Sequence, residues 1–445
     1  MRTKTIMSIA KMFAPILLLF CGSAMAAQGL SSEVPTIDIR NGTASAIPVV
    51  VVPFGFEGTM PPETDVAGVV SGDLNRCGQF KALDKKDIIE SPTRGKDIKF
   101  QTWNQLKQAY IVVGREIENP GGDVRVEFEL YDVAKQQQML GLAITSQKTG
   151  LRDVGHQVAD LVYEKITGVR GAFWTRIAYI TSTGVGSNIN YALMVADSDG
   201  VNPQTVVRSR EPLLSPAWSP DGRKLAYVSF ERGNSSIYIQ EIATGAREVV
   251  SSAKGINGAP SFSPDGSKLA LTLSYGGSPD IYVMNLATRE KVQLTKHFAI
   301  DTEPTWMPDG QSIIFTSDRS GKPQLYQVSA NGGEATRVTF AGEYNARATI
   351  SYDGKHIAMA QGAGNVYRIA VLDRATGESK AVSVGNLDES PSYAPNGSMI
   401  LYAATEGPRG VLYAVSADGR VRQRLILADG DVREPAWSPF RQRGQ

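Results

Sequence analysis

Cysteine and histidine are scarce in this chain of 445 residues, which contains two cysteines and three histidines. The pattern Cys-x-x-Cys is absent, and His156, His297 and His356 fall in separate predicted elements without His-Glu-x-x-His spacing. The usual sequence signatures of structural zinc, thiol redox chemistry and zinc-dependent hydrolysis are therefore missing. We expect no metal site and no cofactor.

A nucleophile elbow of the form Gly-x-Ser-x-Gly is also absent. This pentapeptide holds the catalytic serine of α/β-hydrolases, including peptidases that carry a propeller as a gating domain. Such enzymes need a further hydrolase domain of roughly 250 residues, for which this chain has no room beside the segments described below. We therefore expect no catalytic residues and no enzymatic activity.

Neither sign of charge dominates, because 46 lysines and arginines face 45 aspartates and glutamates. A basic run interleaved with aromatic residues does not occur either. A balanced chain of this kind lacks the positive field that nucleic acid and acidic membrane surfaces attract. We exclude nucleic acid as a partner.

Long apolar runs are limited to one, Met12–Phe20, which follows basic residues and is too short to span a bilayer. Small residues follow at the spacing that signal peptidase accepts, so we expect residues 1–26 to be a signal peptide cleaved between Ala26 and Ala27. Cys21 then leaves with the signal, and Cys77 remains as a small core residue. The mature chain would be periplasmic, without direct membrane insertion.

The dominant positive feature is an internal repeat. Its copies begin with a short strand that leads into a turn of the type Ser-Pro-Asp-Gly, and successive copies are 44, 44, 44, 43 and 44 residues apart. They lie at residues 216–222, 260–266, 304–310, 348–354, 391–397 and 435–439. A period of about 44 residues with four strands in each unit is typical of a β-propeller.

The strand that follows each turn is the clearest of the four. We expect these second strands at Lys224–Ser229, Lys268–Leu273, Ser312–Ser317, His356–Gln361 and Met399–Ala404. An aliphatic residue followed by tyrosine begins each third strand, and a polar turn leads to the fourth. The segment Asp197–Gly200 faintly resembles a calcium loop, but it occupies this polar-turn position, so we interpret it as a hairpin turn.

The two ends of the repeat region predict how the ring closes. Residues 177–208 match the second, third and fourth strands of a unit that lacks its first strand, and Pro435–Pro439 is a first strand with nothing after it. Together they complete one blade, which also removes exposed strand edges. We expect a six-bladed propeller over residues 171–445, closed by the C-terminal strand.

Residues 41–168 have a different pattern and predict a small α/β domain. Buried or half-buried strands are expected at 47–54, 110–113, 124–131 and 140–146, and amphipathic helices at 65–77 and 152–167, with a further helical pattern starting at Trp103. Residues 27–40 precede this domain as a flexible segment that binds a partner. The predicted fold is thus a multidomain chain, α/β followed by all-β.

The two residues that precede each repeat motif differ between units, although the scaffold positions repeat. The pairs are Leu214-Ser215, Gly258-Ala259, Thr302-Glu303, Ala346-Arg347, Glu389-Ser390 and Arg433-Glu434. Symmetry collects these pairs around the channel mouth. Individual polar side chains on a rigid rim are what a specific binding surface requires, although for any one residue an ordinary solvated loop is an equal alternative.

Taken together, the chain resembles the TolB family of the Tol-Pal system of Gram-negative bacteria. Specific matches are found at residues 47–54, 165–173, 176–180, 215–222 and 302–306, and the resemblance covers residues 33 to 440. It implies an adaptor that links the inner-membrane TolA–TolQ–TolR complex to the outer-membrane peptidoglycan-associated lipoprotein. Such an adaptor supports outer-membrane invagination in cell division and envelope integrity, and some bacteriocins use the same surfaces during import.

The resemblance also implies where the partners bind. The lipoprotein would dock at the channel mouth, on Asn257, Ala259, Thr302, Glu303, Arg347, Glu389 and Glu434. TolA would bind the N-terminal segment through Glu33, Val34, Ile37, Asp38 and Ile39. Residues 27–32 extend beyond the family's usual start, and Ile256 stands where the family can carry histidine.

Two alternatives remain beside the adaptor, a propeller-type hydrolase or lyase and a glycan-binding propeller. The missing nucleophile elbow disfavours the first. The second needs an aromatic platform at the rim, whereas Trp218, Trp306 and Trp437 lie within predicted first strands, where packing between blades is expected.

Overall fold

The computed structural model describes residues 37–39, 46–427 and 430–442. The expected signal peptide, its cleavage site between Ala26 and Ala27, and the segment residues Glu33 and Val34 lie outside these residues. No helix in the described part of the chain is long and apolar enough to cross a bilayer.

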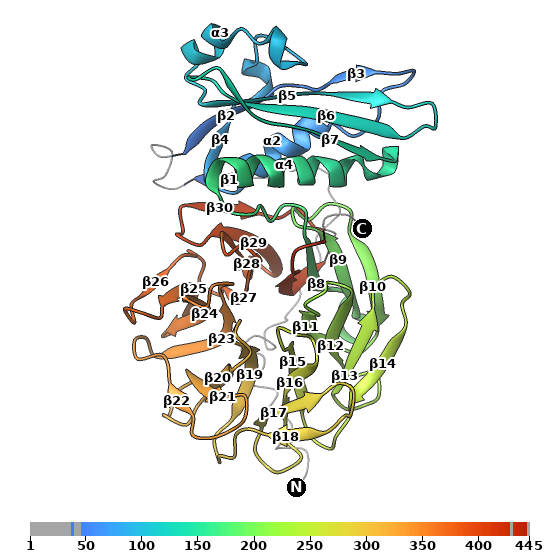
Figure 1. Cartoon of the computed structure of the whole chain (residues 1–445). Helices are drawn as coiled ribbons and strands as arrows, with labels where there is room; N and C mark the ends of the chain where they lie inside the picture. The colour runs from blue at the N-terminus through green and yellow to red at the C-terminus, as the bar shows by residue number, and fades with distance from the viewer. Residues whose placement is uncertain (1–36, 40–45, 428–429, 443–445) are drawn as a thin grey trace. The chain divides into compact units, whose positions relative to one another are not determined.

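The N-terminal α/β domain is a mixed sheet with helices on both faces (Figure 1). The strand order is β4-β2-β5-β6-β7, with β2 parallel to both β4 and β5 and the remaining neighbours antiparallel, while β3 pairs with β5. Its elements are β2 (Ile47–Val51), β3 (Gly55–Glu57), α2 (Val66–Arg76), β4 (Phe80–Ala82), α3 (Phe100–Gln105), β5 (Tyr110–Glu118), β6 (Val124–Asp132), β7 (Gln137–Ser146) and α4 (Leu151–Thr167).

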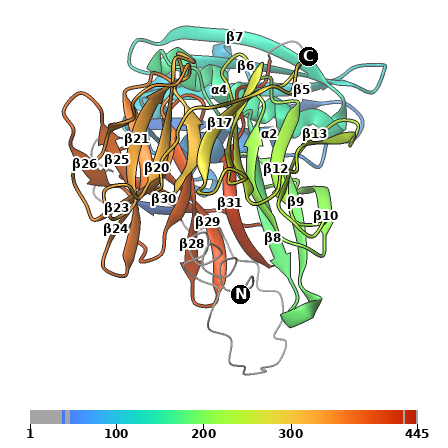
Figure 2. The ribbon, with the colours of Figure 1, turned by 90° about the horizontal axis from the view of Figure 1, so that it is seen from below.

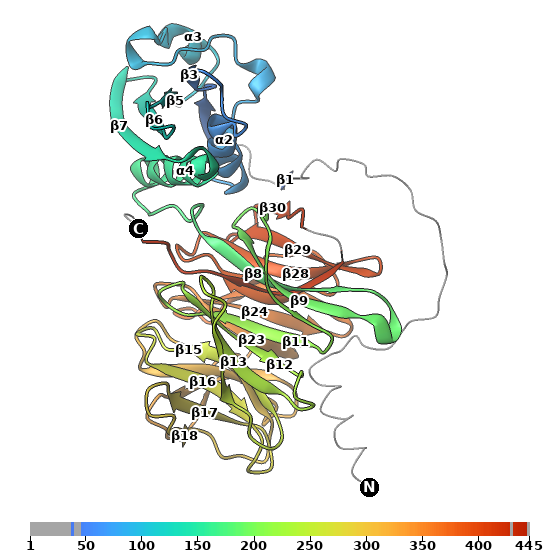
Figure 3. The same cartoon turned by 90° about the vertical axis from the view of Figure 1, so that its right-hand side faces the viewer.

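Alternating valines explain why this sheet buries both faces. Val49 and Val51 of β2 pack with α2 and α4, and Val50 packs with Trp103 of α3 on the other side. Figure 3 shows α3 across the sheet from α2 and α4. Asp65 caps α2 by accepting a hydrogen bond from the Gly68 amide at 2.9 Å, which satisfies one of the free donors of the first turn.

Six sheets follow within the described residues and form the β-propeller; five have four strands, and one gains a fifth strand from Ile37–Ile39. Five blades run in chain order from the first to the fourth strand. They are β11 to β14 (Leu213–Trp218, Lys224–Ser229, Ser236–Glu241, Arg247–Ser251), β15 to β18 (Asn257–Phe262, Lys268–Leu273, Asp280–Asn285, Lys291–Gln293), β19 to β22 (Asp301–Trp306, Ser312–Ser317, Gln324–Ser329, Thr336–Arg337), β23 to β26 (Tyr344–Ile350, His356–Ala363, Val366–Asp373, Ser379–Ala381) and β27 to β30 (Glu389–Tyr393, Met399–Glu406, Arg409–Ser416, Val421–Arg424).

The remaining blade is built from both ends of the propeller, as predicted. Its order is β10-β9-β8-β31, formed by β8 (Arg176–Thr183), β9 (Asn190–Asp197), β10 (Gln204–Ser209) and β31 (Asp431–Trp437). Figure 2 shows β31, in red, beside β8, in green. The C-terminal strand therefore closes the ring.

The repeated turn has a clear local cause. In the blade that starts with β11, the Ser219 hydroxyl accepts a hydrogen bond from the Lys224 amide at 2.9 Å and lies 2.5 Å from Asp221 Oδ1. That carboxylate accepts the Arg223 amide at 3.0 Å, and Gly222 takes the positive φ of 69° that ends the turn. The aspartate of the motif is structural.

The tryptophans of the first strands pack between blades. Trp218, Trp306 and Trp437 are all at least nine-tenths buried. Their indole N–H groups donate to the Ala436 carbonyl (3.0 Å), the Ser261 carbonyl (3.1 Å) and the Thr175 hydroxyl (2.8 Å), respectively. This confirms the interpretation as packing residues and leaves no tryptophan platform for a glycan in these strands.

Candidate functional site

The innermost strand of each blade contains a β-bulge at the residues that vary between repeats. The pairing register shifts in all six of these strands, for example between Thr302 and Thr305. At each bulge a residue other than glycine adopts a positive φ between 47° and 55°. These residues are Ser215, Ala259, Glu303, Arg347, Ser390 and Glu434. We refer to them as the bulge ring.

A left-handed backbone at a non-glycine residue costs about 1–3 kcal/mol and persists only where the surrounding structure compensates it. Part of the compensation is visible at two junctions between neighbouring blades. The Ser215 amide donates to Glu434 Oε2 at 2.7 Å, and the Arg347 amide donates to Glu303 Oε2 at 3.1 Å. A glutamate at the bulge of one blade thus accepts the bulge N–H of the next blade.

Arg347 links four of the six innermost strands. Its Nε donates to Glu303 Oε1 at 3.0 Å and one terminal nitrogen donates to Glu434 Oε1 at 3.1 Å, while the other terminal nitrogen donates to the Ser390 hydroxyl. Burial alone would lower the pKa of Arg347, but Glu434, Glu303 and Glu389 outweigh it and raise the pKa. The guanidinium is therefore held charged among carboxylates.

A second ion pair joins this cluster. Arg433 lies 3.5 Å from Glu389 Oε1 and donates to Asp431 Oδ2 at 2.7 Å. Counted together, Glu303, Glu389, Glu434 and Asp431 carry four negative charges, against two on Arg347 and Arg433. The bulge ring together with its neighbours Glu389, Asp431 and Arg433 therefore presents an excess of carboxylate, suited to a partner that donates hydrogen bonds or carries basic groups.

Among the rim residues expected from the sequence, the structure brings Glu303, Arg347 and Glu434 into direct contact and leaves Glu389 the most exposed of the glutamates, at 29% of its side chain. Thr302 is buried, and its hydroxyl lies 3.4 Å from that of Thr272.

Asn257 differs from the expectation of an exposed rim residue, because it has no exposed surface. Its side-chain oxygen accepts from the Ser251 hydroxyl at 2.8 Å, and its amide donates to the carbonyls of Ser235 at 3.0 Å and Ala253 at 2.7 Å. These hydrogen bonds hold the loop that leads into β15. The neighbouring Ala259 contributes a bulge position without a polar group.

Sequence reasoning identified the variable pairs but missed the bulge and the mutual pairing. The expected contacts did not include Ser390, whose hydroxyl accepts a hydrogen bond from Arg347. They also did not include Ser215, whose amide donates to Glu434. A usable signal exists, because five of the six bulge residues directly precede proline. That repeat position could have indicated a special backbone conformation.

The N-terminal segment is described only at β1 (Ile37–Ile39). This strand pairs antiparallel with β30, with Ile37 opposite Gln423, Asp38 opposite Arg422 and Ile39 opposite Val421. It therefore forms a fifth strand at the edge of the β27–β30 blade, visible in Figure 3. In this structure the described part of the segment, expected from the sequence to be flexible, is docked on the propeller.

Comparisons with known proteins agree for both parts of the chain. Residues 35–139 match the family described as the TolB amino-terminal domain, and residues 163–441 match the TolB beta propeller domain. A curated relative from Xanthomonas campestris pv. campestris strain B100, named Tol-Pal system protein TolB, is 71% identical over 91% of this chain and 93% of its own length. One from Xanthomonas oryzae pv. oryzae strain PXO99A, with the same name, is 69% identical over 96% and 97%.

The solved structures include a similar fold over the same extent. The crystal structure of TolB from Acinetobacter baumannii superimposes with a TM-score of 0.83 at 41% identity, covering 92% of this chain and all of that one.

Proposed function

The chain belongs to the TolB family of the Tol-Pal system, and on that premise we propose that it is a non-catalytic periplasmic adaptor. It joins the TolA–TolQ–TolR complex to the peptidoglycan-associated lipoprotein, and so supports outer-membrane invagination during division and the integrity of the envelope. Bacteriocins that enter through this system use the same surfaces.

The bulge ring is the observation that carries the lipoprotein side of this proposal. Six equivalent positions on a rigid scaffold carry serine, alanine, glutamate or arginine, and the side chains of four of them, Glu303, Arg347, Ser390 and Glu434, meet in one charged cluster. A scaffold that repeats its core while varying this ring can bind one partner specifically. The lipoprotein docks here by placing hydrogen-bond donors against Glu389, Glu303 and Glu434.

Charge reversal at Glu303 is a poor test, because a lysine there would face Arg347 and disturb the cluster itself. Glu303→Gln, Glu389→Gln and Glu434→Gln keep the side-chain shape and remove one charge each. Loss of a charge-assisted hydrogen bond costs about 1.5–3 kcal/mol, so each variant should weaken lipoprotein binding roughly 10- to 150-fold.

Glu334→Gln is the matched control for this series. Glu334 is exposed in the turn between β21 and β22, in the same blade as Glu303 but beside its outermost strand. Isothermal titration with the soluble peptidoglycan-binding domain of the lipoprotein measures the affinities. Wild-type affinity in all three variants would refute docking at the bulge ring and the adjacent Glu389.

The β1–β30 pairing supports the TolA side of the proposal. In the described part of the segment, three residue pairs join it to the blade edge, and a ladder of this length can be exchanged for another. The segment formed by residues 27–40 binds TolA by adding as a strand to an exposed sheet edge of that protein, and docking on β30 withholds it. Glu33, Val34, Ile37, Asp38 and Ile39 form its binding part.

Two changes separate this switch from a permanently paired edge strand. Deletion of residues 27–40 should abolish TolA binding and spare the lipoprotein. The double variant Asp38→Cys, Arg422→Cys places thiols on directly opposed positions, at a spacing that a disulfide can bridge. When oxidised it should lose TolA binding, and reduction should restore it. Equal TolA binding by both redox forms would contradict the switch.

A further inference from the structure

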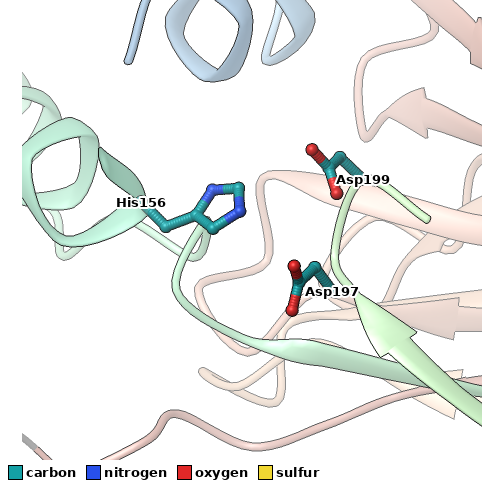
Figure 4. Close-up of side chains that lie close together, drawn as sticks. All are labelled: His156, Asp197 and Asp199. Carbon is teal, nitrogen blue, oxygen red and sulfur yellow. The ribbon is translucent and has the colours of Figure 1, made fainter. Parts of the chain in front are cut away.

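A cluster of possible metal ligands lies away from the bulge ring, where α4 meets the turn between β9 and β10. A nitrogen of His156 and carboxylate oxygens of Asp197 and Asp199 lie within 4.8 Å of one another. Figure 4 shows the imidazole pointing toward both carboxylates. The three residues come from an α-helix and a hairpin more than 30 positions apart. The sequence therefore showed only the faint calcium-loop resemblance of Asp197–Gly200 and no link to His156.

His156 is oriented like a metal ligand. The residue is 1% exposed, and its Nδ1 lies 2.6 Å from Asp73 Oδ2 on α2. A carboxylate at Nδ1 fixes the tautomer in which Nε2 carries a lone pair, the arrangement found behind most metal-binding histidines. Nε2 has no hydrogen-bond partner although it is buried. A buried nitrogen without a hydrogen-bond partner that faces two carboxylates is a candidate metal ligand.

Neighbouring groups hold this geometry in place. Asp73 also accepts Arg76 Nε at 3.0 Å, and Arg76 donates to the Ser198 carbonyl at 3.1 Å and to its hydroxyl at 2.7 Å. Arg76 therefore ties α2 to the same turn that carries Asp197 and Asp199. The turn is anchored independently of any metal.

Charge also favours a cation. Asp73, Asp197 and Asp199 carry three negative charges. The guanidiniums of Arg76 and Arg152 supply two positive charges, so these carboxylates outnumber these guanidiniums by one around the imidazole. Arg152 contacts Oδ2 of both aspartates of the turn. Oδ1 of each carboxylate can therefore face a metal. Asp199 Oδ1 also accepts a hydrogen bond from the Val201 amide at 3.1 Å.

We propose that His156 Nε2, Asp197 and Asp199 bind one Zn²⁺ ion, with water completing a tetrahedral shell. Zinc bonds of about 2.0–2.2 Å place tetrahedral ligands roughly 3.3–3.6 Å apart, so the three atoms need to close by about 1.5 Å at most. A mixed nitrogen and oxygen donor set suits zinc, whereas Mg²⁺ and Ca²⁺ prefer oxygen ligands alone. The bound ion ties α4 to the β9–β10 turn.

The experiment titrates the full-length mature chain, without a histidine tag, with Zn²⁺ in competition with a chromophoric chelator. We expect one ion per chain and a rise in melting temperature with zinc but not with Mg²⁺ or Ca²⁺. His156→Gln and Asp199→Asn should each weaken zinc binding at least tenfold. Co²⁺ should give the visible absorption of a tetrahedral site in the wild type, and His156→Gln should lose it.

His356→Gln is the matched control, because His356 is partly exposed and its Nε2 lies 3.8 Å from Asp373 in an ordinary surface pair. It should bind zinc like the wild type. Melting curves without metal verify that each variant is folded. Asp199→Asn keeps the shape of a side chain that lies in a turn outside the helical core, so it provides a second test if His156→Gln is unstable. No saturable zinc binding, or wild-type binding by Asp199→Asn, overturns the proposal.

Discussion

Ring closure by β31 makes a quantitative prediction for Trp437. This residue is opposite Ile177 of β8, so it lies on the seam where the last strand of the chain meets the first strand of the propeller. Its side chain is 8% exposed, its indole donates to Thr175, and its amide donates to the Ser392 hydroxyl at 2.8 Å. It packs with Ile177, Leu401 and Leu412 in the core across this seam.

Trp437→Ala should destabilise the chain by about 3–5 kcal/mol, the usual cost of truncating a buried tryptophan. The lost indole N–H adds little, because the Thr175 hydroxyl still donates to the Ala172 carbonyl at 2.7 Å. A large domain loses roughly 2 °C per kcal/mol, so the melting temperature should fall by about 6–10 °C.

Differential scanning calorimetry of Trp437→Ala beside Trp306→Ala measures this effect. Trp306 occupies the same repeat position in β19, inside a blade made of one continuous stretch of chain, and is 7% exposed. If closure is as firm as an internal strand pair, the two variants lose similar stability. Firm closure is refuted if Trp437→Ala melts within 1–2 °C of the wild type while the melting temperature of Trp306→Ala falls by about 6–10 °C.

Three further predictions concern the α/β domain. Burial, and to a lesser degree Asp65, raises the pKa of Glu116 to about 7, so the folded chain retains a proton that the unfolded chain releases above about 4.5. Stability should therefore fall by about 2–3 kcal/mol as pH rises from about 4.5 to 7, and Glu116→Gln should remove this dependence in pH-resolved urea titrations; an unchanged slope would contradict it. Asp65→Ala should cost about 1 kcal/mol through the lost α2 cap, and Asp65→Asn much less, by urea denaturation; equal costs would exclude the cap as the cause. Gly72→Ala should stabilise the chain by about 0.5–1 kcal/mol, because the exposed mid-helix position has open space around an added Cβ, and a lower urea midpoint would argue against it.

Local signals in the sequence predicted most of the fold. The second strands of the first three complete blades begin and end at the expected residues, and those of the next two extend two residues further, to Ala363 and Glu406. The turn that precedes each of them is determined by residues within six positions, so it does not depend on distant contacts. Helices α2 and α4 were likewise predicted by spacing of valine and leucine over several turns.

Short strands were harder to predict. β3 and β4 have three residues each, which is too few for a periodic pattern. They form because β3 pairs with β5 and β4 pairs with β2. β7 begins at Gln137 rather than Leu140, because pairing with β6 extends it beyond its apolar part.

The repeat alone determined that this chain is a closed ring of blades with variable residues around its channel, since periodic local turns leave few other ways to bury the apolar strands. Only the tertiary structure decided what those residues do to each other. Glu303, Arg347 and Glu434 are separated by 44 and 87 positions, and ring closure brings them within hydrogen-bonding distance. His156 and Asp199 meet for the same reason, because contacts between elements far apart in the chain depend on packing geometry that no local pattern encodes.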